Sequence, residues 1–187
     1  RQKRFLQLKI IRFIGDVDLT IVLTPFWKKQ LEAIVPNAKI KILFNPVDML
    51  RTSDIREENT LLFLGRLRKE KGVYELLEAC KQLNDDGIDF RLKLAGDGDI
   101  EHFKQYCIEL GIASRVDVLG WVSGKVKDDA ILSSDIYVLP SYFEGLPIGV
   151  LEAMINKLAV VATPVGGIPD VIESTKTGIL VEEKNVN

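Results

Sequence analysis

Two glutamates placed around a glycine-rich bend are the most chemically suggestive pair in this sequence. Glu144 falls in the bend, and Glu152 follows in a segment, residues 148–156, that predicts a helix. At 1.5 Å per helical residue the two positions lie up to roughly 12 Å apart. Carboxylates accept hydrogen bonds from hydroxyl groups, and a helix N-terminus attracts anions. The pattern predicts a site for a diphosphate with a hydroxyl-bearing ring on either side, which Gly145 and Gly149 would let close to the backbone.

A second chemical cluster follows the predicted strand at residues 60–65. The loop runs from Gly65 to Gly72 and carries Arg66 and Lys71. An arginine can hold two phosphate oxygens with its planar guanidinium group, and a lysine adds a mobile positive charge. A solvated turn is the ordinary alternative for a basic loop. We favour phosphate binding, because this loop leaves the end of a strand and glycines bracket it.

Residues 143–147, with the later Glu152, resemble the paired-glutamate signature of the retaining glycosyltransferases of group 1, which have the two-lobed GT-B architecture. The resemblance implies an enzyme that binds a nucleoside diphosphate sugar and transfers the sugar with retention of anomeric configuration. It implies that Arg66 and Lys71 stabilise the leaving diphosphate. It also implies that Glu144 holds the hexose near the reacting carbon and that Glu152 holds the ribose. The backbone that completes this cradle would be that of Leu146, Pro147, Ile148 and Gly149.

Other predicted strand ends carry further candidates for the same site. Gly65 ends one strand, and Gly96 follows the strand at residues 90–95, where it would line the site beside the phosphates. Trp121 and Val122 end another strand, at a place where the resembling family puts backbone and apolar surface against the nucleobase. Trp121 could stack on that base or pack in the core, and the sequence leaves both readings open.

Metal binding is the main alternative for the acidic residues. Two aspartates separated by one residue can hold a divalent ion on the phosphates of a sugar nucleotide, but this spacing occurs twice, at Asp97 and Asp99 and at Asp16 and Asp18. Such a pattern has little specificity, and Asp99 is placed to cap a helix. The sole histidine, His102, lies in a predicted helix without a metal-ligand pattern around it, so we expect a surface residue. We therefore expect donor binding with no metal and no cofactor other than the donor itself.

The elements that must position these groups alternate along the chain between apolar strands and amphipathic helices. The clearest helix covers residues 73–83, where apolar side chains recur at steps of three and four. Strands separated by helices of this length predict an α/β fold with a Rossmann-like parallel sheet flanked by helices, which is the architecture of a GT-B donor lobe. The predicted strands are residues 19–24, 40–44, 60–65, 90–95, 115–119, 135–139, 158–163 and 178–181.

The polar run at residues 51–59 has neither strand nor helix periodicity, and it predicts a linker between two units. By the resemblance, residues 1–52 are the tail of an N-terminal acceptor lobe with the interlobe connection, and residues 53–187 are a donor lobe that is incomplete at its C-terminus. The chain begins at Arg1 rather than Met, so we expect a fragment that binds the donor without efficient turnover. A saccharide or lipid-linked acceptor would bind through the missing lobe.

Composition and charge restrict the class of protein. Hydrophobic residues make up 47% of the chain and the formal net charge is −2, which supports a core and gives no bulk attraction to nucleic acid. No apolar run approaches the roughly 20 residues of a membrane span. Cys80 and Cys107 are expected to be buried thiols in a reducing compartment, so we expect a cytoplasmic protein. Residues 1–14 predict a basic, apolar-rich helix, for which we prefer burial against residues 19–24 to peripheral contact with the inner face of a membrane.

Two other functions remain open at this point. A sugar-nucleotide epimerase of similar architecture would share the phosphate site, but it would need further acids and a histidine suited to proton transfer, which this sequence does not show. A non-catalytic nucleotide-sugar-binding module would share the fold alone. The presence of both glutamates and both basic residues favours the enzyme, because packing requires none of them.

Overall fold

Most of the chain forms one parallel sheet with helices on both faces, and a smaller unit precedes it. The computed structural model describes residues 2–50 and 56–186. In space the strands of the sheet follow the order β5-β4-β3-β6-β7-β8, and all neighbouring pairs are parallel. The predicted Rossmann-like α/β class is therefore confirmed. The strands are β3 (Thr60–Leu64), β4 (Arg91–Ala95), β5 (Val116–Gly120), β6 (Ile136–Leu139), β7 (Ala159–Ala162) and β8 (Ile179–Leu180).

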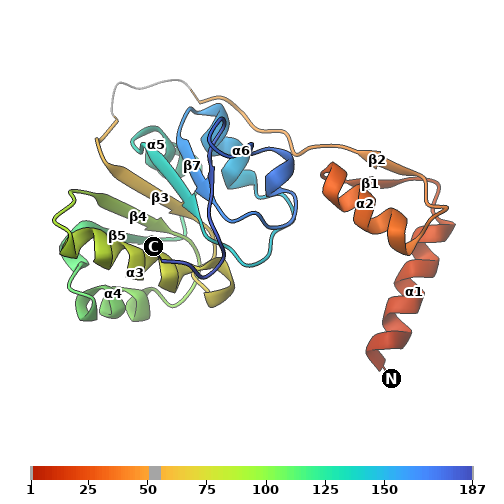
Figure 1. The fold of residues 1–187 in the computed structure, drawn as a ribbon, viewed down its shortest axis with the longest axis horizontal. Helices are drawn as coiled ribbons and strands as arrows, with labels where there is room; N and C mark the ends of the chain where they lie inside the picture. The colour runs from red at the N-terminus through yellow and green to blue at the C-terminus, as the bar shows by residue number, and fades with distance from the viewer. Residues whose placement is uncertain (1, 51–55, 187) are drawn as a thin grey trace.

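Helices supply the crossover connections that parallel strands need. Figure 1 shows α3 and α4 on one side of the sheet and α5 and α6 on the other. The helix predicted at residues 73–83 is confirmed as α3, and the helix predicted after the glycine-rich bend is confirmed as α6. The bounds are α3 (Val73–Asp85), α4 (Ile100–Glu109), α5 (Gly124–Leu132) and α6 (Ile148–Ile155), with short 3₁₀ turns η1 (Lys69–Lys71), η2 (Ala113–Arg115) and η3 (Ile168–Asp170).

The core lies between the sheet and these helices. Val73, Leu77 and Cys80, from the apolar stripe of α3, are fully buried, as is Phe63 of β3. Burial of one large apolar side chain contributes about 1.5–3 kcal/mol to folding. The expected burial of both cysteines is confirmed, and burial raises the pKa of Cys80 to about 12 and that of Cys107 to about 11. Because the thiolate is the reactive form, both thiols are inert in the folded chain at neutral pH.

The N-terminal unit is a two-stranded parallel sheet with two helices, and it lies beside the larger sheet (Figure 1). Ile10 and Phe13 of its first helix are 50% and 69% exposed, so the expected burial of this helix against residues 19–24 is wrong at these positions. None of the described helices combines the length and the apolar character that crossing a bilayer requires. The elements are α1 (Gln2–Asp16), β1 (Thr20–Val22), α2 (Pro25–Ile34) and β2 (Ile40–Ile42).

The start of α2 contacts the bend that carries Glu144. The indole Nε1 of Trp27 donates a hydrogen bond to the carbonyl oxygen of Gly145 at 2.8 Å, and the Trp27 and Phe143 rings form a T-shaped contact. The backbone N–H of Phe26 donates to Asp170 Oδ2 at 2.7 Å. The N-terminal unit is therefore in direct contact with one part of the predicted site.

The predicted boundary between residues 52 and 53 lies outside the described residues, which resume at residue 56. On either side of this gap the chain contacts the same residue. The backbone N–H of Leu50 donates to Asn156 Oδ1 at 2.9 Å, and the Arg56 guanidinium donates to the Asn156 carbonyl oxygen at 2.9 Å. Asn156 at the end of α6 thus fixes both ends of the connection.

Candidate functional site

A cleft opens at the carboxyl ends of the strands, between the two halves of the sheet. β3, β4 and β5 extend the sheet in one direction and β6, β7 and β8 in the other, so the neighbours β3 and β6 belong to different halves. Open parallel sheets bind ligands at such a switch point. The cleft has a volume of about 420 Å³, within the range of small-molecule sites. This switch-point cleft is lined by Leu64, Gly65, Arg66, Lys71, Ala95, Gly96, Trp121, Val122, Lys127, Gly149 and Glu152.

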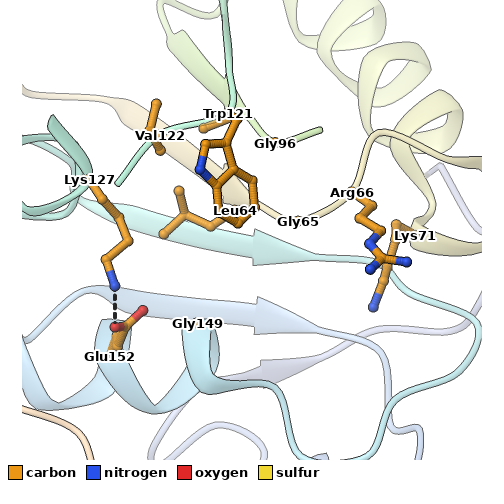
Figure 2. A pocket seen from close by; sticks show the side chains of 11 residues that line it. Leu64, Gly65, Arg66, Lys71, Gly96, Trp121, Val122, Lys127, Gly149 and Glu152 are labelled. Carbon is orange, nitrogen blue, oxygen red and sulfur yellow. Dashed lines mark hydrogen bonds and ion pairs between the residues drawn. The ribbon is translucent and has the colours of Figure 1, made fainter. Parts of the chain in front are cut away.

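Most of the residues singled out in the sequence come together here. Figure 2 shows Arg66 and Lys71 on one side of the switch-point cleft and Glu152 on the other, with Trp121 between them. The predicted residues that line the cleft are Gly65, Arg66, Lys71, Gly96, Trp121, Val122, Gly149 and Glu152. The predicted residues that are not among those lining the cleft are Glu144, Leu146, Pro147 and Ile148.

The basic loop is held in place by its backbone. The N–H of Gly65 donates to the Ala95 carbonyl oxygen at 3.0 Å, and the N–H of Leu67 donates to that of Asp97 at 2.7 Å, so the loop is tied to the end of β4. Gly72 has a φ of 68°, and a Cβ there would lie 2.1 Å from the Pro140 carbonyl oxygen at the end of β6. Only glycine fits this position. The loop therefore presents its basic side chains between β3 and β6.

Lys71 and Glu144 form an ion pair beside the cleft. The Lys71 ammonium lies 2.6 Å from Glu144 Oε1, and the side chains are 28% and 9% exposed respectively. A nearly buried carboxylate needs such a partner, because its desolvation is costly. The pair joins the basic loop to the glycine-rich bend, and Lys71 is the member that lines the cleft.

Helix α6 begins at the edge of the cleft, as the sequence predicted. Pro147 precedes its first turn, Leu146 is buried and Ile148 is 50% exposed. A Cβ on Gly149 would lie 2.4 Å from the Tyr137 hydroxyl oxygen, so only glycine allows the helix to pack this closely. The first turn of α6 thus brings unpaired backbone N–H groups next to the cleft.

Trp121 is an exposed side chain at the mouth of the cleft. It follows β5 and is 75% exposed, so its alternative interpretation as a core residue is wrong. The backbone beneath it is fixed, because the N–H of Gly96 donates to the Gly120 carbonyl oxygen at 2.8 Å. An exposed tryptophan that lines a cleft offers a face on which a planar ring can stack.

Charge in the cleft favours an anion. Arg66, Lys71 and Lys127 supply three cationic groups among the lining residues, and Glu152 supplies one carboxylate. Lys127 pairs with Glu152 at 2.5 Å, and Arg66 and Lys71 lie together on the opposite side of the cleft (Figure 2). Phosphate oxygens are suitable ligands for such a pair.

The residues weighed for metal binding have other positions. Asp99 caps α4, because its Oδ1 accepts the backbone N–H of His102 at 3.1 Å, as expected. His102 is exposed, as expected, and its Nε2 lies 2.9 Å from the Tyr74 hydroxyl oxygen. Within residues 2–50 and 56–186, no group of three or more His, Cys, Asp or Glu side chains is arranged to hold a metal ion. Metal-independent binding stays a prediction.

Comparison with known proteins gives the family. The model of the family described as "Glycosyl transferases group 1" matches residues 50–187. The chain belongs to this family. It is 30% identical over 181 residues to the putative colanic acid biosynthesis glycosyltransferase WcaL of Escherichia coli (strain K12), a match that covers 90% of this chain and 45% of WcaL. The chain spans about half the length of the curated relatives it matches.

Solved structures of glycosyltransferases share the fold. Sucrose-phosphate synthase from Thermosynechococcus elongatus matches with a TM-score of 0.85 at 21% identity, over 96% of this chain and 49% of that one. Anabaena Alr3699/HepE, solved in complex with UDP and glucose, matches with a TM-score of 0.78 at 19% identity, over 96% of this chain and 54% of that one. The six-stranded sheet is therefore the Rossmann-like sheet of a GT-B glycosyltransferase.

Sequence reasoning missed two residues of this group 1 glycosyltransferase site. Lys127 lies in α5, after β5, and no sequence motif marks its position. Tyr137 lies in the middle of β6, and its buried hydroxyl donates to the Leu64 carbonyl oxygen at 3.2 Å. Burial raises the pKa of Tyr137 far above its ordinary range, and the charges of Glu144 and Glu152 add to the rise. Tyr137 is therefore a neutral support beneath the cleft.

Proposed function

We propose that this chain is the donor-binding part of a glycosyltransferase, and that it binds a nucleoside diphosphate sugar in the switch-point cleft. One observation carries the proposal. Arg66 and Lys71, from one loop, line the same cleft at the switch point of the sheet as Glu152, which lies far from them in the sequence. A fold-preserving role does not require two cations and a carboxylate to converge there.

Each part of a donor has a suitable partner in this arrangement. The diphosphate would lie against Arg66 and Lys71, next to the first turn of α6. The nucleobase would stack on Trp121, and the ribose hydroxyls would bind Glu152. Glu144, held by Lys71, would reach the hexose from the side of the bend. Because negative charge grows on the diphosphate as the sugar leaves, the two cations would stabilise the transition state more than the ground state.

The finer details of the reaction belong to the same proposal. The sugar would be transferred to a saccharide or lipid-linked acceptor with retention of anomeric configuration, as in the family that the paired glutamates resemble. Donor binding would need no metal, because Arg66, Lys71 and the first turn of α6 would together offset the charge of the diphosphate. We place the reaction in the cytoplasm, with any membrane contact made at the inner face.

Titration calorimetry with UDP, GDP, ADP and UDP-glucose, in the presence of EDTA, tests the proposal. UDP is the first probe because a structure of the same fold was solved with UDP and glucose. At least one diphosphate should bind, and Arg66→Ala should weaken it about tenfold or more, as expected for the loss of a charged hydrogen bond. Arg68→Ala is the matched control, since Arg68 is an exposed arginine of the same loop that does not line the cleft. No binding by any nucleotide, or equal effects of the two variants, would contradict the proposal.

A further inference from the structure

Lys127 is a cleft residue to which the proposed function assigns no task. It lies on α5, on the side of the switch-point cleft opposite Arg66 and Lys71 (Figure 2). Its side chain is 31% exposed, and its ammonium lies 2.5 Å from Glu152 Oε1. The contact joins two helices that are separated along the chain by β6. Lys127 is therefore not a third phosphate-side cation but a partner of the carboxylate on the nucleoside side.

The geometry of this pair leaves chemical groups available for a ligand. Glu152 is 18% exposed and uses Oε1 for Lys127, while the described residues provide no hydrogen bond to its second oxygen, Oε2. An ammonium group has three donors, of which Glu152 takes one. A charge-assisted bond at this distance fixes the orientation of the carboxylate before any ligand arrives. The free oxygen can then meet a hydroxyl group without further ordering of the side chain.

A neighbouring lysine shows what an ordinary surface pair looks like in this helix. Lys125 lies two residues before Lys127 and pairs with Asp129 four residues later, and its side chain is 84% exposed. Such exposed pairs contribute little to stability, about 0–1 kcal/mol. Lys125 does not line the switch-point cleft, whereas Lys127 does. The two lysines have the same charge and lie on the same helix, but they differ in exposure, in the carboxylate that they pair with and in whether they line the cleft.

The Lys127–Glu152 pair also changes the charge that an anionic ligand meets in the cleft. Glu152 is a carboxylate in the same cleft as the proposed diphosphate, and two anions in one cleft repel each other. The Lys127 ammonium offsets this repulsion where the carboxylate lies. Without Lys127, the carboxylate would be both less ordered and less compatible with the ligand.

We propose that Lys127 is a positioning residue that holds Glu152 toward the 2′-hydroxyl of the bound nucleotide and so makes the cleft selective for ribonucleotides over 2′-deoxyribonucleotides. This inference rests on the proposed function, since it takes the nucleoside diphosphate to occupy the cleft. It goes beyond that function because it names Lys127 as the residue that would make the cleft select a ribose over a 2′-deoxyribose. A site built to bind a hydroxyl discriminates against the analogue that lacks it, since its polar group is then left unpaired.

The test measures affinities of UDP, GDP and ADP and of their 2′-deoxy counterparts by calorimetry, for the wild-type chain and for Lys127→Met. Methionine keeps the apolar stem and removes the charge. The wild type should favour the ribonucleotide about tenfold or more. In Lys127→Met this ratio should fall to within about twofold of one, with most of the loss on the ribonucleotide. Lys125→Met is the matched control and should keep the wild-type ratio.

A double-mutant cycle separates positioning from an independent contact. Glu152→Gln should also remove the discrimination, and Lys127→Met combined with Glu152→Gln should lose no more than either change alone, because both act through one carboxylate. An unchanged ratio in Lys127→Met, or additive losses, would overturn the inference. Binding of ribo- and deoxynucleotides with equal affinity by the wild type would overturn it while leaving the proposed function intact. Failure of every nucleotide to bind would overturn the proposed function itself.

Discussion

The Lys71 ammonium and Glu144 Oε1 lie 2.6 Å apart, and this contact joins the phosphate side of the cleft to the bend that would hold the sugar. Lys71→Met should therefore have two effects. Donor affinity should fall about tenfold or more, and the chain should lose about 1–3 kcal/mol of unfolding free energy because Glu144 is left nearly buried without its partner. Urea denaturation and calorimetry on the same samples measure the two effects.

A further variant, Glu144→Gln, separates the effect of the Lys71–Glu144 pair on stability from its effect on donor binding. Lys71→Met combined with Glu144→Gln should recover most of the stability, because no unpaired carboxylate remains, while diphosphate affinity stays low. Lys69→Met, in the same turn but exposed, is the control and should change neither. If the double variant recovered diphosphate binding as well, Lys71 would act only through Glu144 and not on the phosphates.

Gly149 tests how closely α6 packs on the sheet. Gly149→Ala puts a Cβ 2.4 Å from the Tyr137 hydroxyl oxygen, so we expect a loss of about 1–3 kcal/mol in stability and weaker nucleotide binding. Adding Tyr137→Phe should restore part of both, since the nearest remaining ring atom lies 3.1 Å away. Gly145→Ala, whose Cβ would meet nothing closer than 3.8 Å, should cost far less stability. Equal melting temperatures for the two single alanine variants would refute this steric account.

Trp121 tests the nucleobase end of the cleft. Trp121→Ala should weaken binding of UDP by about five- to 100-fold, the usual effect of losing one stacked aromatic ring. Because the side chain is 75% exposed, the unfolding free energy should change by less than about 0.5 kcal/mol. Pyrophosphate, which has no base, should bind the variant and the wild type equally. A comparable loss for pyrophosphate would show that the ring supports the phosphate side instead.

The burial of the Cys80 thiol predicts a loss of stability at alkaline pH. Its thiol ionises near the ordinary pKa of 9.0 in the unfolded chain and near 12 in the folded chain, chiefly because of burial. The folded chain therefore holds a proton that the unfolded chain releases, and this contribution is complete below pH 9 and is lost as the pH rises toward 12. The slope per thiol approaches about 1.4 kcal/mol per pH unit. Urea titrations between pH 8 and 10.5 should give a shallower slope for Cys80→Ala, and an unchanged slope would count against thiol burial as the cause.

The sequence was sufficient for the fold because its signals are local. Each of the eight predicted strands is present, with bounds that agree or differ by one or two residues, since short apolar runs between amphipathic helices define a parallel sheet strongly. The basic loop and the second glutamate were also found, because motifs at strand ends converge at one edge of such a sheet. Helix α1 was predicted as a helix, but what its apolar side chains contact depends on tertiary structure.

The parts that the sequence did not reveal are tertiary pairings. Nothing in the neighbourhood of Lys127 distinguishes it from Lys125, and only the packing of α5 against α6 selects the lysine that reaches Glu152. Tyr137 looked like one more apolar position of a strand, although its hydroxyl supports Leu64 and limits position 149 to glycine. Such roles arise where elements distant in the chain meet, and the periodicity of the sequence does not reveal them.

The most direct test of the account is a crystal structure of the chain soaked with the nucleoside diphosphate that binds best in calorimetry. The account predicts the diphosphate against Arg66 and Lys71, the ribose at Glu152 and the base on Trp121. A diphosphate bound away from the switch-point cleft, with these four side chains in contact with water alone, would contradict it.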